Sequence, residues 1–262
     1  MTKELNKEFL ISCVTTAKRA AKSAEQIIKR YYKCAPKTTI KEDLTPVTQA
    51  DIECEQVIKQ VLAAQFPDFG FYGEETGKSN TDSDFMWLVD PIDGTKSFVR
   101  EYGFFSTQIA LMYRGEIIIG VSHAPIFNET AWAAKGLGAF IDDESVQVSE
   151  FIKAEESCYS TGNLKSYAQS PKNWEKLRQV MSLAHKTRGY GDFYHYHLLA
   201  AGKLELVIES DLNILDIAAL SVIIKEAGGI MTDITGKAID LETTSVLAGN
   251  HASYNQALPL LK

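Results

Sequence analysis

The chain has 262 residues, of which 45% are hydrophobic and 23% charged, and its 34 acidic and 27 basic residues leave a formal net charge of -7. This is ordinary globular composition, and the length allows one large domain or two modest ones. No apolar run approaches the roughly 18 residues that cross a bilayer, and an acidic chain without a Lys/Arg cluster argues against nucleic-acid binding. Four well-separated cysteines without a CxxC pair are typical of reduced thiols, so we expect a cytoplasmic protein without membrane contact.

The chain begins with two predicted helices. Between residues 5 and 31, apolar side chains recur every three or four positions, which is the period of an amphipathic helix. A second helix is predicted to begin near Thr48 and to end before Pro67.

Short apolar runs then predict strands. Residues 85–89 indicate a buried strand that ends in Asp90. Two hairpins follow, with strands predicted over residues 105–113, 117–122, 130–134 and 138–141.

Polar residues 142–149 mark a predicted seam between two halves. Beyond it we expect strands over residues 157–160 and 205–209 and helices over residues 173–185, 193–201 and 216–227. Helices followed by hairpins indicate an α+β first half, residues 1–145, and the later alternation indicates an α/β second half, residues 146–262.

The densest polar cluster surrounds Asp90 and Asp93. Two carboxylates so close repel each other unless a cation lies between them, and sites rich in oxygen suit Mg²⁺. The amides of Gly94 and Thr95, at the start of a turn or short helix, could hold an anion. The alternative for an isolated Asp-x-x-Asp is a capped turn with solvated aspartates.

Three further acidic segments accompany this cluster. Glu74 and Glu75 follow an apolar run, Asp51 closes the polar segment 44–51, and Asp216 begins an apolar helix. Each segment alone is better explained by a structural role than by a catalytic or metal-binding one: the first as a charged loop, the second as a turn that leads into a helix, and the third as a helix N-cap.

Together, in this order and spacing, the four segments resemble the inositol monophosphatase superfamily of Mg²⁺-dependent, Li⁺-sensitive phosphatases. The string Asp-Pro-Ile-Asp-Gly-Thr-Lys-Ser-Phe at residues 90–98 is highly specific for that family, and the resemblance extends from about residue 41 to residue 250. It implies an α+β fold layered as an α-β-α-β-α sandwich, a homodimer, and hydrolysis of a small phosphorylated metabolite. The metal site would belong mainly to residues 1–145 and the choice of substrate to residues 146–262.

The resemblance also implies ligands for two or three Mg²⁺ ions. Glu74, Asp90 and the Ile92 carbonyl would hold one ion, and Asp90, Asp93 and Asp216 would hold a second. Such ions lower the pKa of a bound water, neutralise phosphate oxygens and stabilise the leaving alkoxide.

Catalytic roles follow from the same resemblance. Glu75 would orient water around a third, weaker metal site. Gly94 and Thr95 would face the phosphate with their amides and the Thr95 hydroxyl. Asp51 would accept a hydrogen bond from Thr95 and so help to activate the attacking water.

The second half departs from the inositol-phosphatase pattern. Leu215 and Leu220 replace the Trp and Gly that usually flank the downstream metal ligand, and Asp192 stands where a small neutral residue is usual. Asp192, with Asp-Ile-Ala-Ala-Leu at residues 216–220, resembles the histidinol-phosphate phosphatase branch, which implies histidinol phosphate as the favoured substrate. Asp192 and Glu209 would put two carboxylates near the leaving group, which agrees with the ammonium and imidazole of that substrate. The alternative for Asp192 is an N-cap on the helix that follows. His195 and His197 on that helix are predicted to be surface or interface residues and not ligands.

Other functions stay open at this point. The substrate could be inositol-1-phosphate or a range of sugar phosphates. Lys96, after Gly-Thr, resembles the nucleotide 3′-phosphatase branch. A different class would be a non-catalytic binding protein that has kept the fold.

Overall fold

The computed structural model describes residues 5–34, 38–40, 46–150, 153 and 156–262. Part of the polar segment 44–51 therefore lies outside the described residues. The long N-terminal helices are α1 (Lys7–Tyr31) and α2 (Gln49–Gln65), near the ranges expected from periodicity. A short antiparallel pair, β1 (Thr38–Ile40) and β2 (Pro46–Thr48), connects them.

A large sheet carries the predicted hairpins. Its strands are β3 (Gly70–Gly73), β4 (Gly77–Ser79), β5 (Phe85–Asp93), β6 (Ser106–Tyr113), β7 (Glu116–Ala124), β8 (Glu129–Ala134), β9 (Gly138–Ile141) and β10 (Glu144–Val146). Their order across the sheet is β10-β9-β8-β7-β6-β5-β3-β4. Every residue of β5 is buried, which is the pattern of a strand covered on both faces.

A smaller sheet forms the second half. Its strands are β11 (Cys158–Thr161), β12 (Lys186–Arg188), β13 (Leu206–Ser210), β14 (Ile230–Thr232) and β15 (Ser245–Gly249), in the order β12-β11-β13-β15-β14. The remaining helices are α3 (Thr95–Val99), α4 (Lys165–Gln169), α5 (Pro171–Met181), α6 (Asp192–Ala200), α7 (Ile214–Glu226) and α8 (His251–Leu261).

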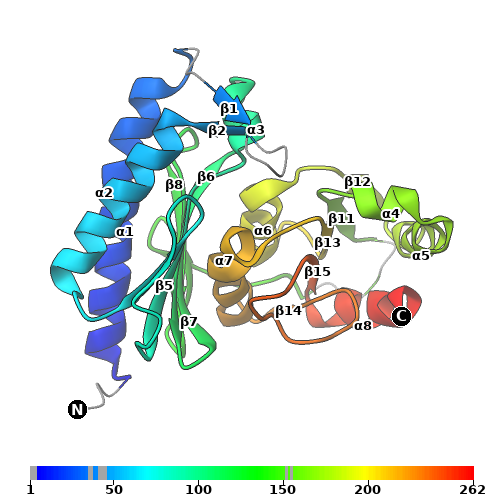
Figure 1. The fold of residues 1–262 in the computed structure, drawn as a ribbon. Coiled ribbons are helices and arrows are strands. Elements are labelled where there is room, and N and C mark those ends of the chain that lie inside the picture. Colours follow the sequence, from blue (N-terminus) through cyan, green and yellow to red (C-terminus); the bar gives the residue numbers. More distant parts are fainter. Residues whose placement is uncertain (1–4, 35–37, 41–45, 151–152, 154–155) are drawn as a thin grey trace.

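The elements stack in five layers (Figure 1). Helices α1 and α2 cover the outer face of the large sheet, α6 and α7 lie between the sheets, and α4, α5 and α8 cover the small sheet. Separate apolar clusters fill the spaces between them. The predicted α-β-α-β-α sandwich is confirmed. None of the helices in the described ranges is long and apolar enough to cross a membrane.

Several boundaries differ from the expectations. The predicted seam at residues 142–149 contains β10, because these residues pair with β9 and extend the large sheet. The division between residues 145 and 146 stays a prediction. Helix α7 begins at Ile214, before Asp216, since Asn213 and not Asp216 is its N-cap. All four cysteines are free thiols, as expected.

Candidate active site

Two carboxylates leave the same edge of the large sheet because β3 and β5 run parallel. Gly73 of β3 is in register with Val89 of β5, so Glu74 and Asp90 follow at the same level. The Glu74 amide donates a hydrogen bond to the Val89 carbonyl at 3.2 Å. The pairing of these strands thus joins two acidic segments that lie 16 residues apart in the sequence.

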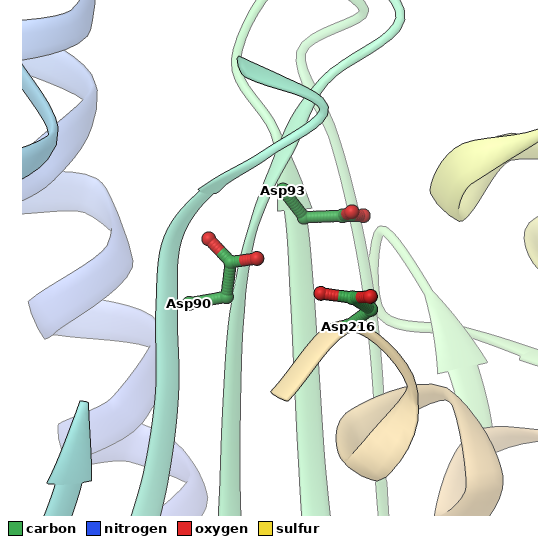
Figure 2. A group of neighbouring side chains, drawn as sticks. All are labelled: Asp90, Asp93 and Asp216. Atoms are coloured by element: carbon green, nitrogen blue, oxygen red, sulfur yellow. The ribbon is translucent and has the colours of Figure 1, made fainter. Parts of the chain in front are cut away.

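A bulge in β5 turns Asp93 toward the side of Asp90. The strand pairs with β6 at Asp90–Gln108 and again at Asp93–Ser106, so three steps along β5 match two along β6. Residues three apart on a regular strand face opposite sides, and one extra residue reverses that alternation. In Figure 2 both carboxylates lie beside Asp216.

Helix α7 supplies Asp216 from the middle layer. Asn213 caps the helix by accepting from the Leu215 amide at 2.7 Å. Asp216 completes a capping box, since its Oδ2 accepts from the Asn213 amide at 2.9 Å. The cap fixes the Asp216 carboxylate at the helix end that faces Asp90 and Asp93.

The three aspartates form a strongly acidic cluster. One carboxylate oxygen from each of Asp90, Asp93 and Asp216 lies within 4.8 Å of the others. Burial, and then the neighbouring carboxylates, raise the pKa of Asp90 and of Asp93 well above the usual range. Burial raises the pKa of Asp216 to about 7, although a hydrogen bond from Asn213 opposes the shift. Acids that repel one another in this way fit a divalent cation, and their hard oxygen donors suit Mg²⁺.

Thr95 and Gly94 follow this cluster directly. Gly94 has φ 92°, and a Cβ there would lie 2.7 Å from the Phe104 carbonyl oxygen, so the turn requires glycine. Helix α3 begins at the next residue, as the sequence predicted. The Thr95 hydroxyl lies 3.3 Å from Asp51 Oδ1 and 3.1 Å from the Ile92 carbonyl oxygen. Asp51 is therefore beside Thr95, as expected from the resemblance.

Glu75 and Glu209 do not line the cavity. The Glu75 amide is bound by Glu55 of α2. Glu209 is 1% exposed. Its Oε2 accepts from Tyr196 at 2.9 Å and contacts His195 Nε2 at 3.0 Å, while its Oε1 accepts from the Asn163 amide at 3.2 Å. Glu209 thus lies behind the cavity wall, with both oxygens in use.

Asp192 does reach the cavity. Gly191 and not Asp192 is the N-cap of α6, and no side chain caps that helix. The alternative of an N-cap is therefore wrong. Asp192 has φ 47°, and its carboxylate contacts the Ser97 hydroxyl at 3.5 Å across the two halves. Burial and then Glu209 raise its pKa to about 6.

The two histidines of α6 are buried inside the chain, so they are not the surface or interface residues that were predicted. His195 is 0% and His197 is 2% exposed. His197 contacts Ser122 Oγ at 2.8 Å and Glu129 Oε1 at 2.7 Å. The spacing of the two histidines predicted that their rings lie on different faces of α6. It did not predict that each ring would contact a buried side chain, Glu209 for His195 and Ser122 for His197.

A cavity of about 320 Å³ gathers these groups. Its lining is Glu74, Asp90, Ile92, Asp93, Gly94, Thr95, Lys96, Ser97, Asn163, Asp192, Asp211, Leu212, Asn213 and Asp216. Sequence reasoning did not assign a site role to Lys96, Ser97, Asn163, Asp211, Leu212 or Asn213. Asn163 and Asp211 follow β11 and β13, which run parallel, so both emerge at one edge of the small sheet. The parallel pairing of β11 and β13, and not a sequence motif, brings Asn163 and Asp211 into the site.

Comparison with known proteins bears on this site. The model of the inositol monophosphatase family matches residues 10–261. Over 203 residues the chain is 37% identical to a histidinol-phosphatase of Mycobacterium tuberculosis, covering 76% of this chain and 78% of that one. It is 35% identical over 224 residues to an inositol-1-monophosphatase of Caulobacter vibrioides, covering 82% and 87%. The crystal structure of the extragenic suppressor protein suhB from Bartonella henselae matches with a TM-score of 0.88 at 31% identity, covering 96% and 98% of the two chains.

The chain therefore belongs to the inositol monophosphatase family. It is an enzyme of the phosphatase class, which hydrolyses phosphate monoesters. The alternative of a non-catalytic binding protein is not supported.

Proposed function

We propose that this phosphatase hydrolyses histidinol phosphate in a reaction that depends on Mg²⁺. The observation that carries the choice of substrate is Asp192, whose carboxylate lines the cavity and caps no helix. The similarity to the histidinol-phosphatase of Mycobacterium tuberculosis supports the same choice.

The acidic cluster is proposed to hold the metal. Glu74, Asp90 and the Ile92 carbonyl would bind one ion, and Asp90, Asp93 and Asp216 would bind a second. When bound, Mg²⁺ would supply positive charge for the phosphate and a lowered pKa for the attacking water. Glu75 is proposed to order solvent near a third, weaker site, and Li⁺ is expected to inhibit.

The protein's own groups would orient the water and the phosphate. The Thr95 hydroxyl carries one proton and lies between two acceptors, Asp51 Oδ1 and the Ile92 carbonyl oxygen. With its proton held there, the Thr95 oxygen is free to accept a hydrogen bond from the attacking water. The amides of Gly94 and Thr95 are proposed to face the phosphate, since both residues line the cavity.

Asp192 would recognise the leaving group. A carboxylate with a pKa of about 6 is ionised above neutral pH, and it would form a charge-assisted hydrogen bond to the substrate ammonium or imidazole. Glu209 is proposed to add negative potential from behind the wall, because its oxygens are already bound by His195, Tyr196 and Asn163.

Inositol-1-phosphate is the second candidate substrate. The observation in its favour is the similarity to the Caulobacter vibrioides inositol-1-monophosphatase, at nearly the same identity as the histidinol-phosphatase. Lys96 lines the cavity, which keeps a nucleotide 3′-phosphate as a third compound to test.

A homodimer is proposed through an apolar, largely aromatic surface. Tyr102, Ile126 and Phe127 are 47%, 40% and 40% exposed. The Phe127 ring stacks on Tyr194 with centroids 5.2 Å apart, which makes the patch continuous with α6. Contiguous exposed apolar patches commonly mark interfaces. Sedimentation should give a dimer, and Phe127→Glu should give a monomer.

The experiment that tests the substrate is phosphate release in Mg²⁺ with four compounds. They are histidinol phosphate, inositol-1-phosphate, fructose-1,6-bisphosphate and adenosine-3′,5′-bisphosphate, compared by kcat/KM. Histidinol phosphate should lead by about tenfold or more, equivalent to about 1.4 kcal/mol of transition-state preference. A lead for inositol-1-phosphate would instead favour the second candidate.

A further inference from the structure

Helix α2 presents two buried carboxylates one turn apart. Asp51 and Glu55 are 1% and 0% exposed, and residues four apart lie on the same helix face. Asp51 contacts the Thr95 hydroxyl. Glu55 has no part in the mechanism described above, although a fully buried carboxylate requires strong partners.

The partners of Glu55 are two consecutive backbone amides. Its Oε2 accepts from the Glu75 amide at 2.7 Å, and its Oε1 accepts from the Thr76 amide at 2.8 Å. Both distances are typical of hydrogen bonds to a charged acceptor. The carboxylate therefore binds the backbone immediately after Glu74.

The packing around this carboxylate is tight. A Cβ on Gly73 would lie 2.5 Å from the Glu55 carboxyl carbon and 2.6 Å from the Phe71 ring. Gly73 thus allows Glu55 to approach the chain at the residue just before Glu74. On the other side, the Glu74 amide is bound to the Val89 carbonyl. Glu74 is held between a strand and a helix.

We propose that Glu55 is a positioning residue that fixes the Gly73–Thr76 turn, so that the Glu74 carboxylate is preorganised to bind the metal ion. The inference rests on the proposed function, since it takes Glu74 as a metal ligand. Partners of this kind orient the direct ligands of metal ions, and their loss typically weakens metal binding by about 10- to 100-fold.

The chemistry of the contact requires a carboxylate. Two N–H donors converge on two acceptor oxygens, so a glutamine of the same shape would turn its NH₂ group toward one of the amides. One hydrogen bond would be lost and two donors would face each other. Glu55→Gln should therefore loosen the turn without creating a cavity.

A matched control separates positioning from general stability. Glu205 is another buried carboxylate, 3% exposed, that accepts from a backbone amide, that of Cys158 at 2.6 Å, and from the Ser149 hydroxyl at 2.9 Å. It belongs to the small-sheet half and to neither the cavity lining nor the acidic cluster. Both Glu→Gln variants should lower the melting temperature of the metal-free protein.

The test is the affinity for Mg²⁺ alone, measured by isothermal titration calorimetry without substrate. Glu55→Gln should raise the Kd by about tenfold or more, while Glu205→Gln should leave it within about twofold. If Glu55→Gln does not fold, Thr76→Pro removes one of the two donors and should weaken binding, whereas Thr76→Ala keeps the amide and should not.

Two results would overturn the proposal. Wild-type Mg²⁺ affinity in folded Glu55→Gln, or in folded Thr76→Pro, would leave Glu55 a structural role only. Wild-type protein that binds no Mg²⁺ would remove the proposed metal site, and the positioning role with it. A failure of histidinol phosphate as substrate would affect neither reading, because the titration contains no substrate.

Discussion

The Thr95 hydroxyl lies 3.3 Å from the Asp51 carboxylate, although the two residues are 44 positions apart in the sequence. If this pair orients the attacking water, Thr95→Val should lower kcat by about 100-fold or more, in the range of a lost proton-transfer group. Valine keeps the shape of threonine but not its hydroxyl. Steady-state kinetics with saturating Mg²⁺ would measure the loss.

The conservative exchange is the control for this prediction. Thr95→Ser keeps the hydroxyl and should retain most of the activity. Calorimetry should give the same Mg²⁺ affinity for both variants, because the side chain of Thr95 is not a proposed ligand. A Thr95→Val enzyme with kcat near the wild-type value would exclude the role assigned to this pair.

Asp93→Asn should separate activity from stability. Removing one charge from the cluster should lower kcat by orders of magnitude, since a proposed metal ligand is lost. The metal-free variant should be at least as stable as the wild type, because repulsion from Asp216 is relieved. Thermal unfolding in EDTA and a phosphate-release assay would measure the two effects. A variant that unfolds, or one with full activity, would contradict the metal assignment.

The same cluster predicts an unusual pH dependence for the metal-free protein. Burial raises the pKa of Asp216 from 3.8 to about 7 in the folded state. Between these values the folded protein binds more protons than the unfolded chain, so the free energy of unfolding falls as pH rises. The stability that protonated Asp216 contributes is fully present below pH 3.8 and is lost as pH rises through about 7.

Melting temperatures across that window, in EDTA and in excess Mg²⁺, would check the prediction. Saturating metal should remove the decline, because it binds the ionised carboxylates. Asp216→Asn should also flatten the EDTA profile relative to the wild type, which isolates this group from the other acids. A wild-type EDTA profile that runs parallel to that of Asp216→Asn would refute it.

The central part of the site could be predicted from the sequence because it is local. Asp90, Asp93, Gly94 and Thr95 lie within six residues, and the bulge that turns Asp93 toward Asp90 belongs to the same segment. The layered fold was predicted through the family resemblance that this local motif carries, whereas the periodicity of the helices and hairpins was only compatible with it.

The residues that sequence reasoning misjudged depend on contacts between distant segments. Glu209 was predicted to bind the substrate, but its oxygens accept from Tyr196 and the Asn163 amide and contact His195 Nε2. His195 and His197 were expected at the surface or an interface, but β13 supplies Glu209 as a partner of His195, and Ser122 and Glu129 on β7 and β8 contact His197. Asp211 entered the site through strand pairing alone. The periodicity of apolar residues along the chain does not predict contacts between separate segments.

The end of α7 and the β8–β9 turn are joined by one side chain outside the cavity. Glu226 is the last residue of α7. Its carboxylate accepts from the amides of Gly136 and Gly138 at 3.0 and 3.1 Å. This clamp ties α7 to the β8–β9 turn. Glu226→Ala should lower the free energy of unfolding by about 1.5–3 kcal/mol, the net contribution of hydrogen bonds to a charged group, and should leave kcat/KM unchanged.

Urea denaturation would measure the effect of the clamp. Glu116→Ala is a suitable control, because Glu116 forms an exposed ion pair with Lys135 in the same region at 2.7 Å. Exposed pairs contribute about 0–1 kcal/mol, so this variant should change stability little. Equal losses in the two variants would show that the clamp adds nothing beyond surface charge.

Asp192 is proposed to set the substrate specificity. Asp192→Asn keeps the shape of the side chain and its reach to Ser97 but removes the charge. For histidinol phosphate kcat/KM should fall by about 10- to 100-fold, the range of a lost hydrogen bond to a charged group. For inositol-1-phosphate, which offers only hydroxyls to this wall, it should change by less than about threefold on the same argument. Ser97→Ala tests whether the contact at 3.5 Å matters by itself. Equal losses on both substrates would mean that Asp192 shapes the cavity and does not select a cation.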